Sequence, residues 1–160
     1  MNTVEYRRVV GHFATGVTVV TTFDEGRQWG MTANSFTSVS LDPVLVLVAV
    51  EGRARFHDAV LASGTFAVNV LAADQEDLSR WFATRGRPQD DNEVGRWPYS
   101  LGPKTGAALF DGALATLECA TYATYPGGDH TLVVGEVIGL DLPRPDAEPL
   151  LYFRGGYAGR

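Results

Sequence analysis

Lysine is almost missing from this chain of 160 residues, where Lys104 is the only one. Together, lysine and arginine number 13 against 19 acidic residues, which gives a formal net charge of −6 at pH 7. A negative protein is repelled by a polyanion such as DNA and by an anionic membrane surface. The arginines are also spread along the sequence rather than clustered. The charge pattern therefore argues against a protein that binds nucleic acid or a membrane.

Cysteine is equally scarce, and the single Cys119 excludes an internal disulfide and a C-x-x-C metal or redox motif. We expect its side chain to be a small buried hydrophobe. The sequence has no charged-then-apolar signal segment at its start, and no apolar run approaches the ~20 residues of a membrane helix. A cytoplasmic location is the resulting prediction.

Common catalytic and nucleotide-binding motifs are also missing. The sequence contains no G-x-G-x-x-G, no G-x-x-x-x-G-K-[ST], no H-E-x-x-H and no G-x-S-x-G. His12, His57 and His130 lie far apart in the chain and show no metal-ligand spacing. We therefore predict no metal site, and no local arrangement indicates a protein nucleophile.

What the chain does have is glycine, valine, threonine and aromatic residues, which favour sheet over helical bundle. A length of 160 residues fits a single domain over residues 1–160. The run Val44–Val50 is apolar throughout and too short for most helices, so it predicts a strand buried on both faces. Residues 17–33 have the pattern of a β-hairpin around an acidic, glycine-containing turn.

Helical patterns are short and lie between the predicted strands. One begins near the N-terminus with Thr3 as a possible N-cap, one ends at Gly64, and one has Asp74 near its N-cap. Strands joined by tight turns favour a mainly β, β-rich α+β fold with an antiparallel barrel and short flanking helices. The loop Thr84–Gly106 is polar and without period, so we expect a lid, a partner surface or a mobile segment.

Two polar stretches follow predicted strands. Residues 30–40, with the sequence GMTANSFTSVS, can turn backbone amides and hydroxyls toward a planar heterocycle or a phosphate, although a solvated turn has the same composition. Arg53 and Arg55 stand where a helix begins, and a helix N-terminus attracts phosphate. Ordinary solvated arginines are the alternative interpretation.

Asp129 and His130 follow a Gly-Gly turn and precede an apolar run. They permit three interpretations: a catalytic pair, half of a metal site, or the corner of a hairpin. Without other information the hairpin corner is the simplest of these.

The chain resembles the flavin reductase-like family in four segments that occur in the same order. They are GMTANSFTSVSLDPVLVLVAV, SGTFAVNVLAADQEDLSRWFA, LECATYATYPGGDHTLVVGEV and PLLYFRGGY. Within this family, the chain resembles the small NAD(P)H:flavin oxidoreductases that supply two-component flavin-dependent monooxygenases. The resemblance extends from about Tyr6 to Tyr157. It implies a split β-barrel of Greek-key type that forms a homodimer with flavin near the subunit interface.

The resemblance also implies roles for particular residues. The flavin isoalloxazine ring would lie along Thr32–Ser35, and the ribityl phosphate would lie at Ser38–Ser40 and at the turn Val50–Phe56. His130 would contact the nicotinamide, with Asp129 orienting it and Phe82 and Tyr157 as further contacts. The complete flavin set is Met31, Thr32, Ala33, Asn34, Ser35, Ser38, Val39, Ser40, Ala49, Val50, Glu51, Arg53, Arg55 and Phe56. Many relatives have serines and threonines where this chain has EGRARF, which leaves FAD and FMN both open.

The expected activity is hydride transfer from nicotinamide C4 to flavin N5, in which the cofactors supply the chemistry and the protein positions them. We expect FAD, with FMN as the alternative, and NADH, with NADPH as the alternative. Other hypotheses are a flavin-binding protein without turnover, a carrier of small apolar ligands, and an oxidase of pyridoxamine type. The last requires a basic pocket, for which the sequence gives little sign.

Overall fold

The computed structural model describes residues 1–87 and 94–158, and their backbone is mainly strand. The strands are β1 (Thr15–Gly16), β2 (Thr18–Asp24), β3 (Arg27–Ala33), β4 (Thr37–Leu41), β5 (Val44–Glu51), β6 (Thr65–Val70), β7 (Tyr99–Leu101), β8 (Ala108–Phe110), β9 (Ala115–Gly127), β10 (His130–Asp141), β11 (Leu151–Phe153) and β12 (Gly156–Ala158). The helices are α1 (Thr3–Val10), α2 (Arg55–Ser63) and α3 (Glu76–Ala83), with 3₁₀ turns η1 (Ala73–Gln75) and η2 (Val94–Arg96). The predicted β-rich fold with short helices is confirmed.

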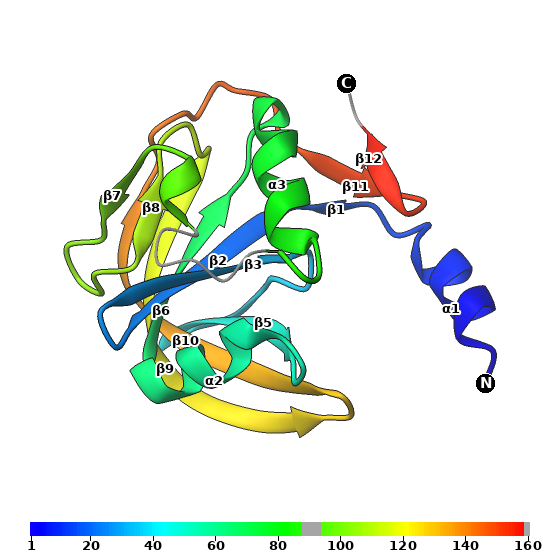
Figure 1. Ribbon diagram of the computed structural model, residues 1–160, viewed down its shortest axis with the longest axis horizontal. Helices are drawn as coiled ribbons and strands as arrows, with labels where there is room; N and C mark the ends of the chain where they lie inside the picture. The colour runs from blue at the N-terminus through cyan, green and yellow to red at the C-terminus, as the bar shows by residue number, and fades with distance from the viewer. Residues whose placement is uncertain (88–93, 159–160) are drawn as a thin grey trace.

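One seven-stranded sheet has the order β3-β2-β6-β9-β10-β5-β4, and all of its strand pairs are antiparallel. Strands β3 and β4 are its two edges, and within the described residues no sheet closes into a barrel. A further sheet joins β1, β11 and β12, and a third joins β7 and β8. Figure 1 shows the long β9–β10 hairpin reaching beyond the body beneath α2, with α3 on the opposite side of β2 and β3.

The predicted hairpin of residues 17–33 is confirmed, because β2 and β3 pair from Thr18↔Ala33 to Asp24↔Arg27. The turn between them uses Glu25 and Gly26 at positive φ. The helix predicted to end at Gly64 is also confirmed, since Gly64 is in the left-handed conformation (φ 73°).

The N-cap predicted for α1 is wrong, whereas the helix predicted to begin near Asp74 is confirmed, because Gln75 is the N-cap of α3. Asn2, not Thr3, caps α1, because its Oδ1 accepts hydrogen bonds from the amides of Val4 and Glu5. Asp74 lies in the 3₁₀ turn before α3 and pairs with Arg144 instead. For α1, two suitable side chains stand side by side, and composition alone does not identify which of them is the N-cap.

Strand β5 is not buried on both faces as predicted. Val46, Val48 and Val50 are almost fully buried, whereas Leu47 and Ala49 are half-buried. Alternate side chains of a strand point to opposite faces, so only one face of β5 belongs to the core. The other face is available to form the wall of a cavity.

The segment predicted as a structureless loop, Thr84–Gly106, contains η2 and β7, and residues 88–93 within it lie outside the described part of the chain. Two core clusters hold the fold together. One lies around Val48, Phe56 and Phe66, and the other around Phe82 and Phe110. Among the described helices, none is long and apolar enough to span a membrane.

Candidate functional site

A cavity of about 690 Å³ opens where β3, the end of β5 and the segment after α3 meet. Its lining contains predicted and unpredicted residues: Gly30, Met31, Thr32, Ala33, Asn34, Ser35, Ala49, Glu51, Arg53, Ala54, Arg55, Phe56, Phe82, Ala83, Thr84, Arg85, Gly86, Arg87 and His130. Its volume is in the range of sites that hold small molecules and cofactors. Segments far apart in the sequence therefore converge on one candidate site.

The first wall of the cavity is the free edge of β3. Because β3 pairs only with β2 in the seven-stranded sheet, every second residue turns its backbone N–H and C=O away from that sheet. The Gly30 carbonyl is one of these groups, since it accepts a hydrogen bond of 2.8 Å from Arg87 Nη2. By strand alternation, the backbone of Thr32 faces the same way. This edge offers donors and acceptors in a row, as the flat rim of a heterocycle requires.

The hydroxyls on this wall already have protein partners. Thr32 Oγ1 donates to the Ser79 carbonyl at 2.7 Å, which ties β3 to α3. Ser35 Oγ donates to the Ala49 carbonyl at 3.2 Å and accepts from the Ala49 amide at 3.0 Å, which ties the end of β3 to β5. These two side chains hold the cavity wall in place, so backbone groups are the better candidates for ligand contacts.

The opposite end of the cavity is cationic. Arg53, Arg55 and Arg85 line it, and α2 begins there, while Arg87, which also lines the cavity, reaches the β3 edge at the Gly30 carbonyl. The arginines are spread along the sequence, but the fold brings four of them together. The turn after β5 and the segment after α3 lie about 30 residues apart in the sequence, and the fold brings them together. An arginine cluster at a helix N-terminus is suited to a phosphate or diphosphate.

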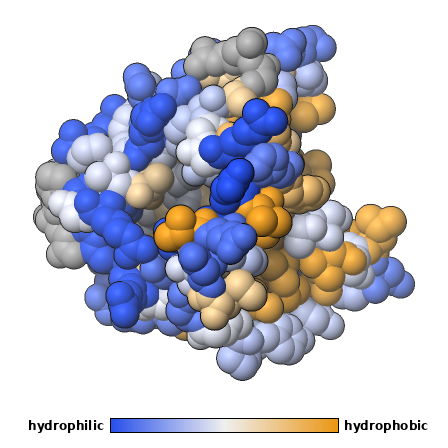
Figure 2. Space-filling model, turned by 90° about the vertical axis from the view of Figure 1, so that its right-hand side faces the viewer, coloured by the Kyte–Doolittle hydropathy of each residue, from blue (hydrophilic) through white to orange (hydrophobic). Residues whose placement is uncertain are grey.

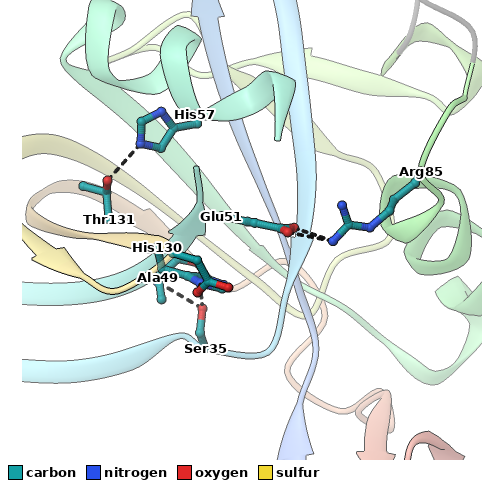
Figure 3. Close-up of polar contacts among 8 residues, drawn as sticks. Ser35, Ala49, Glu51, His57, Arg85, His130 and Thr131 are labelled. Atoms are coloured by element: carbon teal, nitrogen blue, oxygen red, sulfur yellow. Dashed lines mark hydrogen bonds and ion pairs between the residues drawn. The ribbon is translucent and has the colours of Figure 1, made fainter. Parts of the chain in front are cut away.

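One carboxylate stands among these arginines. Glu51, the last residue of β5, accepts two hydrogen bonds from Arg85 Nη2, at 2.7 Å to Oε1 and 2.8 Å to Oε2. This ion pair raises the pKa of Arg85, first through the hydrogen bond and then through the charge of Glu51. Figure 3 shows the two side chains reaching toward each other from opposite sides of the cavity.

Arg87 is a fixed part of the wall. Besides the Gly30 carbonyl, its guanidinium binds the carbonyls of Phe82 and Thr84, and its own carbonyl accepts a hydrogen bond from Arg55 Nη2 at 3.1 Å. These contacts secure the segment after α3 to β3 and α2. Arg85, by contrast, projects from this fixed segment with its side chain 75% exposed.

His130 stands at the corner of the β9–β10 hairpin and lines the cavity (Figure 3). Strand pairing places it directly opposite Glu51, and the Gly52 amide donates to the Asp129 carbonyl at 2.9 Å, which fixes the corner against β5. His130 Nδ1 lies 2.7 Å from Asp129 Oδ1, an arrangement that directs the other ring nitrogen away from Asp129. This contact lowers the pKa of Asp129.

Some predicted site residues lie elsewhere. Ser38, Val39 and Ser40 belong to β4, the far edge of the sheet, where the pairing register shifts between Ser38 and Ser40, and none of them lines this cavity. Val50 is buried in the core, and Asp129 contacts His130 without lining the cavity. The remaining predicted residues line the cavity, except for Tyr157.

Tyr157 lines a second cavity of about 660 Å³, which shares Thr32, Asn34, Ala83 and Thr84 with the first. Its hydroxyl lies 2.6 Å from Ser79 Oγ, and the Arg80 guanidinium lies 4.8 Å from its ring centre. The two predicted aromatic contacts to nicotinamide, Phe82 and Tyr157, are thus on different cavities.

Gly30 and Ala54 lie within the predicted stretches 30–40 and Val50–Phe56, but sequence reasoning did not assign five other lining residues to the flavin or nicotinamide site: Ala83, Thr84, Arg85, Gly86 and Arg87. Four of them follow α3 directly, in the segment TRGR, which begins the loop expected to be a lid, a partner surface or a mobile segment. The sequence signal for this part of the site was a pair of arginines, one on each side of Gly86, directly after a helix. No group of three potential metal ligands occurs in the described residues, and His57 Nε2 contacts Thr131 Oγ1 at 2.8 Å instead.

Comparison with known proteins adds a family and relatives. A family model described as "Flavin reductase like domain" matches residues 10–159. A protein of Streptomyces globisporus named NADH-dependent FAD reductase is 48% identical over 153 residues, covering 96% of this chain and 82% of the relative. The reductase subunit HsaB of a flavin-dependent monooxygenase from Mycobacterium tuberculosis is 38% identical over 156 residues, covering 96% and 80%.

Among solved structures, the S. globisporus NADH:FAD oxidoreductase SgcE6 in complex with NAD and FAD fragments is similar to this fold with a TM-score of 0.92. It is 45% identical, and the match covers 99% of this chain and 93% of that one. The similarity in sequence and in structure thus extends along nearly the whole chain.

Proposed function

The chain belongs to the flavin reductase-like domain family, and from that premise we propose that it is an NADH-dependent flavin reductase that supplies reduced flavin to a partner monooxygenase. The observation that carries this function is the cavity, which is lined by the edge of β3 and by four arginines. Relatives named as NADH-dependent FAD reductase and as reductase subunit of a flavin-dependent monooxygenase support both parts of the proposal.

The residues of the cavity fit a flavin. A flavin combines a flat heterocycle, which needs hydrogen-bonding groups along its rim, with an anionic tail. The segment Gly30–Asn34 supplies hydrogen-bonding groups for the heterocycle, and Arg53, Arg55 and Arg85 supply positive charge for the anionic tail. FAD is the flavin we propose, with FMN as the alternative, because the cationic end suits either one phosphate or two.

When bound together, NADH and flavin supply the redox chemistry, in which hydride leaves nicotinamide C4 and reaches flavin N5. The protein contributes position and electrostatics. Backbone groups of β3 orient the ring, and the fixed wall formed by Thr32, Ser35 and Arg87 keeps these groups rigid. The cationic end holds the anionic tail and favours negative charge in the cavity.

His130 is our proposed contact for the nicotinamide. It lies opposite Glu51 on the hairpin corner and projects into the cavity, and Asp129 fixes the orientation of its ring. Since Asp129 accepts a hydrogen bond from Nδ1, the second nitrogen is free to contact the carboxamide or to hold charge near the flavin. Phe82 contributes a buried apolar surface, and a role for Tyr157 would require the second cavity to take part.

The finer features of the fold stay predictions. We propose that residues 1–160 are one domain, that the seven-stranded sheet is the core of a split β-barrel, and that the location is cytoplasmic. The basic cavity removes the argument from sequence against an oxidase of pyridoxamine type, but the relatives favour the reductase.

We also propose a homodimer. Helix α1 has no buried residue, and its exposed apolar side chains include Val4, Val9 and Val10, with Phe13 just beyond it 79% exposed. A groove of about 960 Å³, lined in part by Val10, Phe13 and Phe36, lies beside it. Figure 2 views the side that carries α1 and shows hydrophobic surface gathered there. A second copy would cover this surface, and the mass of the protein in solution tests the proposal.

Activity is tested by following NADH oxidation at 340 nm with FAD, FMN or riboflavin added separately, and NADPH as the comparison donor. No flavin-dependent rate with either donor would refute the proposed function. Tight retention of flavin without oxidation of nicotinamide would indicate the flavin-binding alternative.

The role of His130 is tested by His130→Ala. We expect a higher KM for NADH or a lower kcat, with flavin affinity and thermal stability largely unchanged. A variant with normal kinetics would reduce His130 to a residue of the hairpin turn.

A further inference from the structure

The Glu51–Arg85 ion pair extends across the cavity that we assign to the flavin. Glu51 ends β5 and Arg85 follows α3, so the pair joins two walls. The Arg85 side chain is 75% exposed and that of Glu51 is 29% exposed. An ion pair that exposed contributes little to folding stability. Its position in the cavity calls for an explanation in terms of binding.

We propose that Glu51 is an internal competitor for Arg85, which it occupies in place of the flavin phosphate and thereby weakens flavin binding. This inference rests on the proposed function. Glu51 is an acid among four arginines, and its carboxylate engages the guanidinium through both oxygens, as a phosphate would. Both hydrogen bonds come from Arg85 Nη2, so a phosphate that binds this nitrogen must displace the carboxylate. A reductase that hands its flavin to another protein benefits from such reversible binding.

The neighbours of Glu51 favour exchange of Arg85 between partners. His130 lies opposite Glu51 on β10, and Arg53 and Arg55 follow it on the turn and α2. Arg87 donates to three backbone carbonyls and accepts from Arg55 through its own carbonyl, whereas the side chain of Arg85 pairs with Glu51. When Arg85 turns to a ligand, Arg53 and Arg55 still line the same cavity as Glu51.

The test compares riboflavin with FMN, which differ by the phosphate alone, and adds FAD as a third ligand. Affinity is measured by flavin fluorescence for the complete chain. Glu51→Gln should tighten FMN and FAD about tenfold, corresponding to about 1.4 kcal/mol, and change riboflavin less than about twofold. Arg85→Gln should weaken FMN and FAD by a similar factor and leave riboflavin unchanged.

The double variant separates competition from simple repulsion between Glu51 and the phosphate. With competition, Glu51→Gln has little effect once Arg85 is Gln. With repulsion, the tightening persists in that background, and the inference is overturned. The matched control is Asp74→Asn, which removes the carboxylate from the Arg144 pair outside the cavity and should not change flavin affinity.

The failures of this inference and of the proposed function are distinguishable. If Glu51→Gln binds FMN like the wild type while the wild type oxidises NADH with flavin, only the competitor role is refuted. If tightening is equal for riboflavin and FMN, Glu51 acts on the ring and the inference also fails. If the wild type binds no flavin and shows no flavin-dependent oxidation, both proposals fall.

Discussion

Gly30 is the position where one methyl group should have the largest calculable effect on the cavity. It lies on β3 within the cavity wall, and a Cβ atom built there would come 2.8 Å from Phe82 Cε1 and 2.9 Å from Cδ1. Carbon atoms in contact prefer about 3.5–4.0 Å, so Gly30→Ala requires the ring to move. Phe82 is only 2% exposed and packs against Trp97 and Phe110, with ring centres 5.8 Å apart in both cases.

The expected cost follows from two opposing effects. Overpacking a filled core costs about 1–3 kcal/mol, and the rigid ring with its aromatic neighbours points to the upper end. Alanine in a strand recovers about 0.5–1 kcal/mol relative to glycine. The net loss in the free energy of unfolding should be about 2 kcal/mol, which for a chain of this length lowers Tm by about 4–8 °C.

Urea denaturation of Gly30→Ala, alone and combined with Phe82→Leu, is the assay. If the clash with the ring is the cause, the cost of Gly30→Ala should fall to near zero in the Phe82→Leu background. Gly16→Ala is the matched control, because its added Cβ would meet no atom within 4 Å. Equal destabilisation with and without Phe82, or none at all, would refute the packing argument.

Three other predictions concern groups outside the cavity wall. Asn69→Ala should destabilise by about 2–4 kcal/mol in urea, because the fully buried amide bonds the Phe110 N–H and two backbone carbonyls that would lose their partner. Burial, with a smaller contribution from the charge of Glu118, raises the pKa of Cys119 to about 12, so a thiol reagent at pH 8 should react only on unfolding. Contact with His130 lowers the pKa of Asp129, so its stabilisation is present above about pH 4 and is lost as pH falls through the folded value; Asp129→Asn should reduce the difference in urea midpoint between pH 7 and pH 3.

Local patterns in the sequence predicted those elements whose residues determine them locally. The hairpin of β2 and β3 follows from a β-branched run and a mixed run around a glycine turn, and the end of α2 follows from Gly64, which has φ 73° in the structure. The burial of β5 was predicted wrongly, because an apolar run does not reveal that one face is used for a cavity. That information lies in the arrangement of neighbouring strands.

The candidate site was predicted in part for the same reason. Residues 31–35 and His130 were predicted through their resemblance to a family motif, and these residues do line one cavity. Arg85 and Arg87 carry no motif, and their contacts depend on how the segment after α3 packs against β3 and α2. Pairing of Thr32 and Ser35 with backbone carbonyls is likewise a tertiary feature, and it changes which atoms remain for a ligand.

The net charge and the cavity charge have opposite signs, and salt should reveal which governs flavin binding. The chain as a whole carries −6, yet four arginines and one glutamate line the cavity. If the whole-chain charge dominated, added salt would screen repulsion and strengthen FMN binding. If the cavity dominates, salt screens attraction, so raising ionic strength from about 0.1 to 1 M, which shortens the Debye length from about 10 to 3 Å, should weaken FMN binding. Riboflavin, which has no phosphate, should respond little, and stronger FMN binding at high salt would refute the assignment of the cationic end to the phosphate.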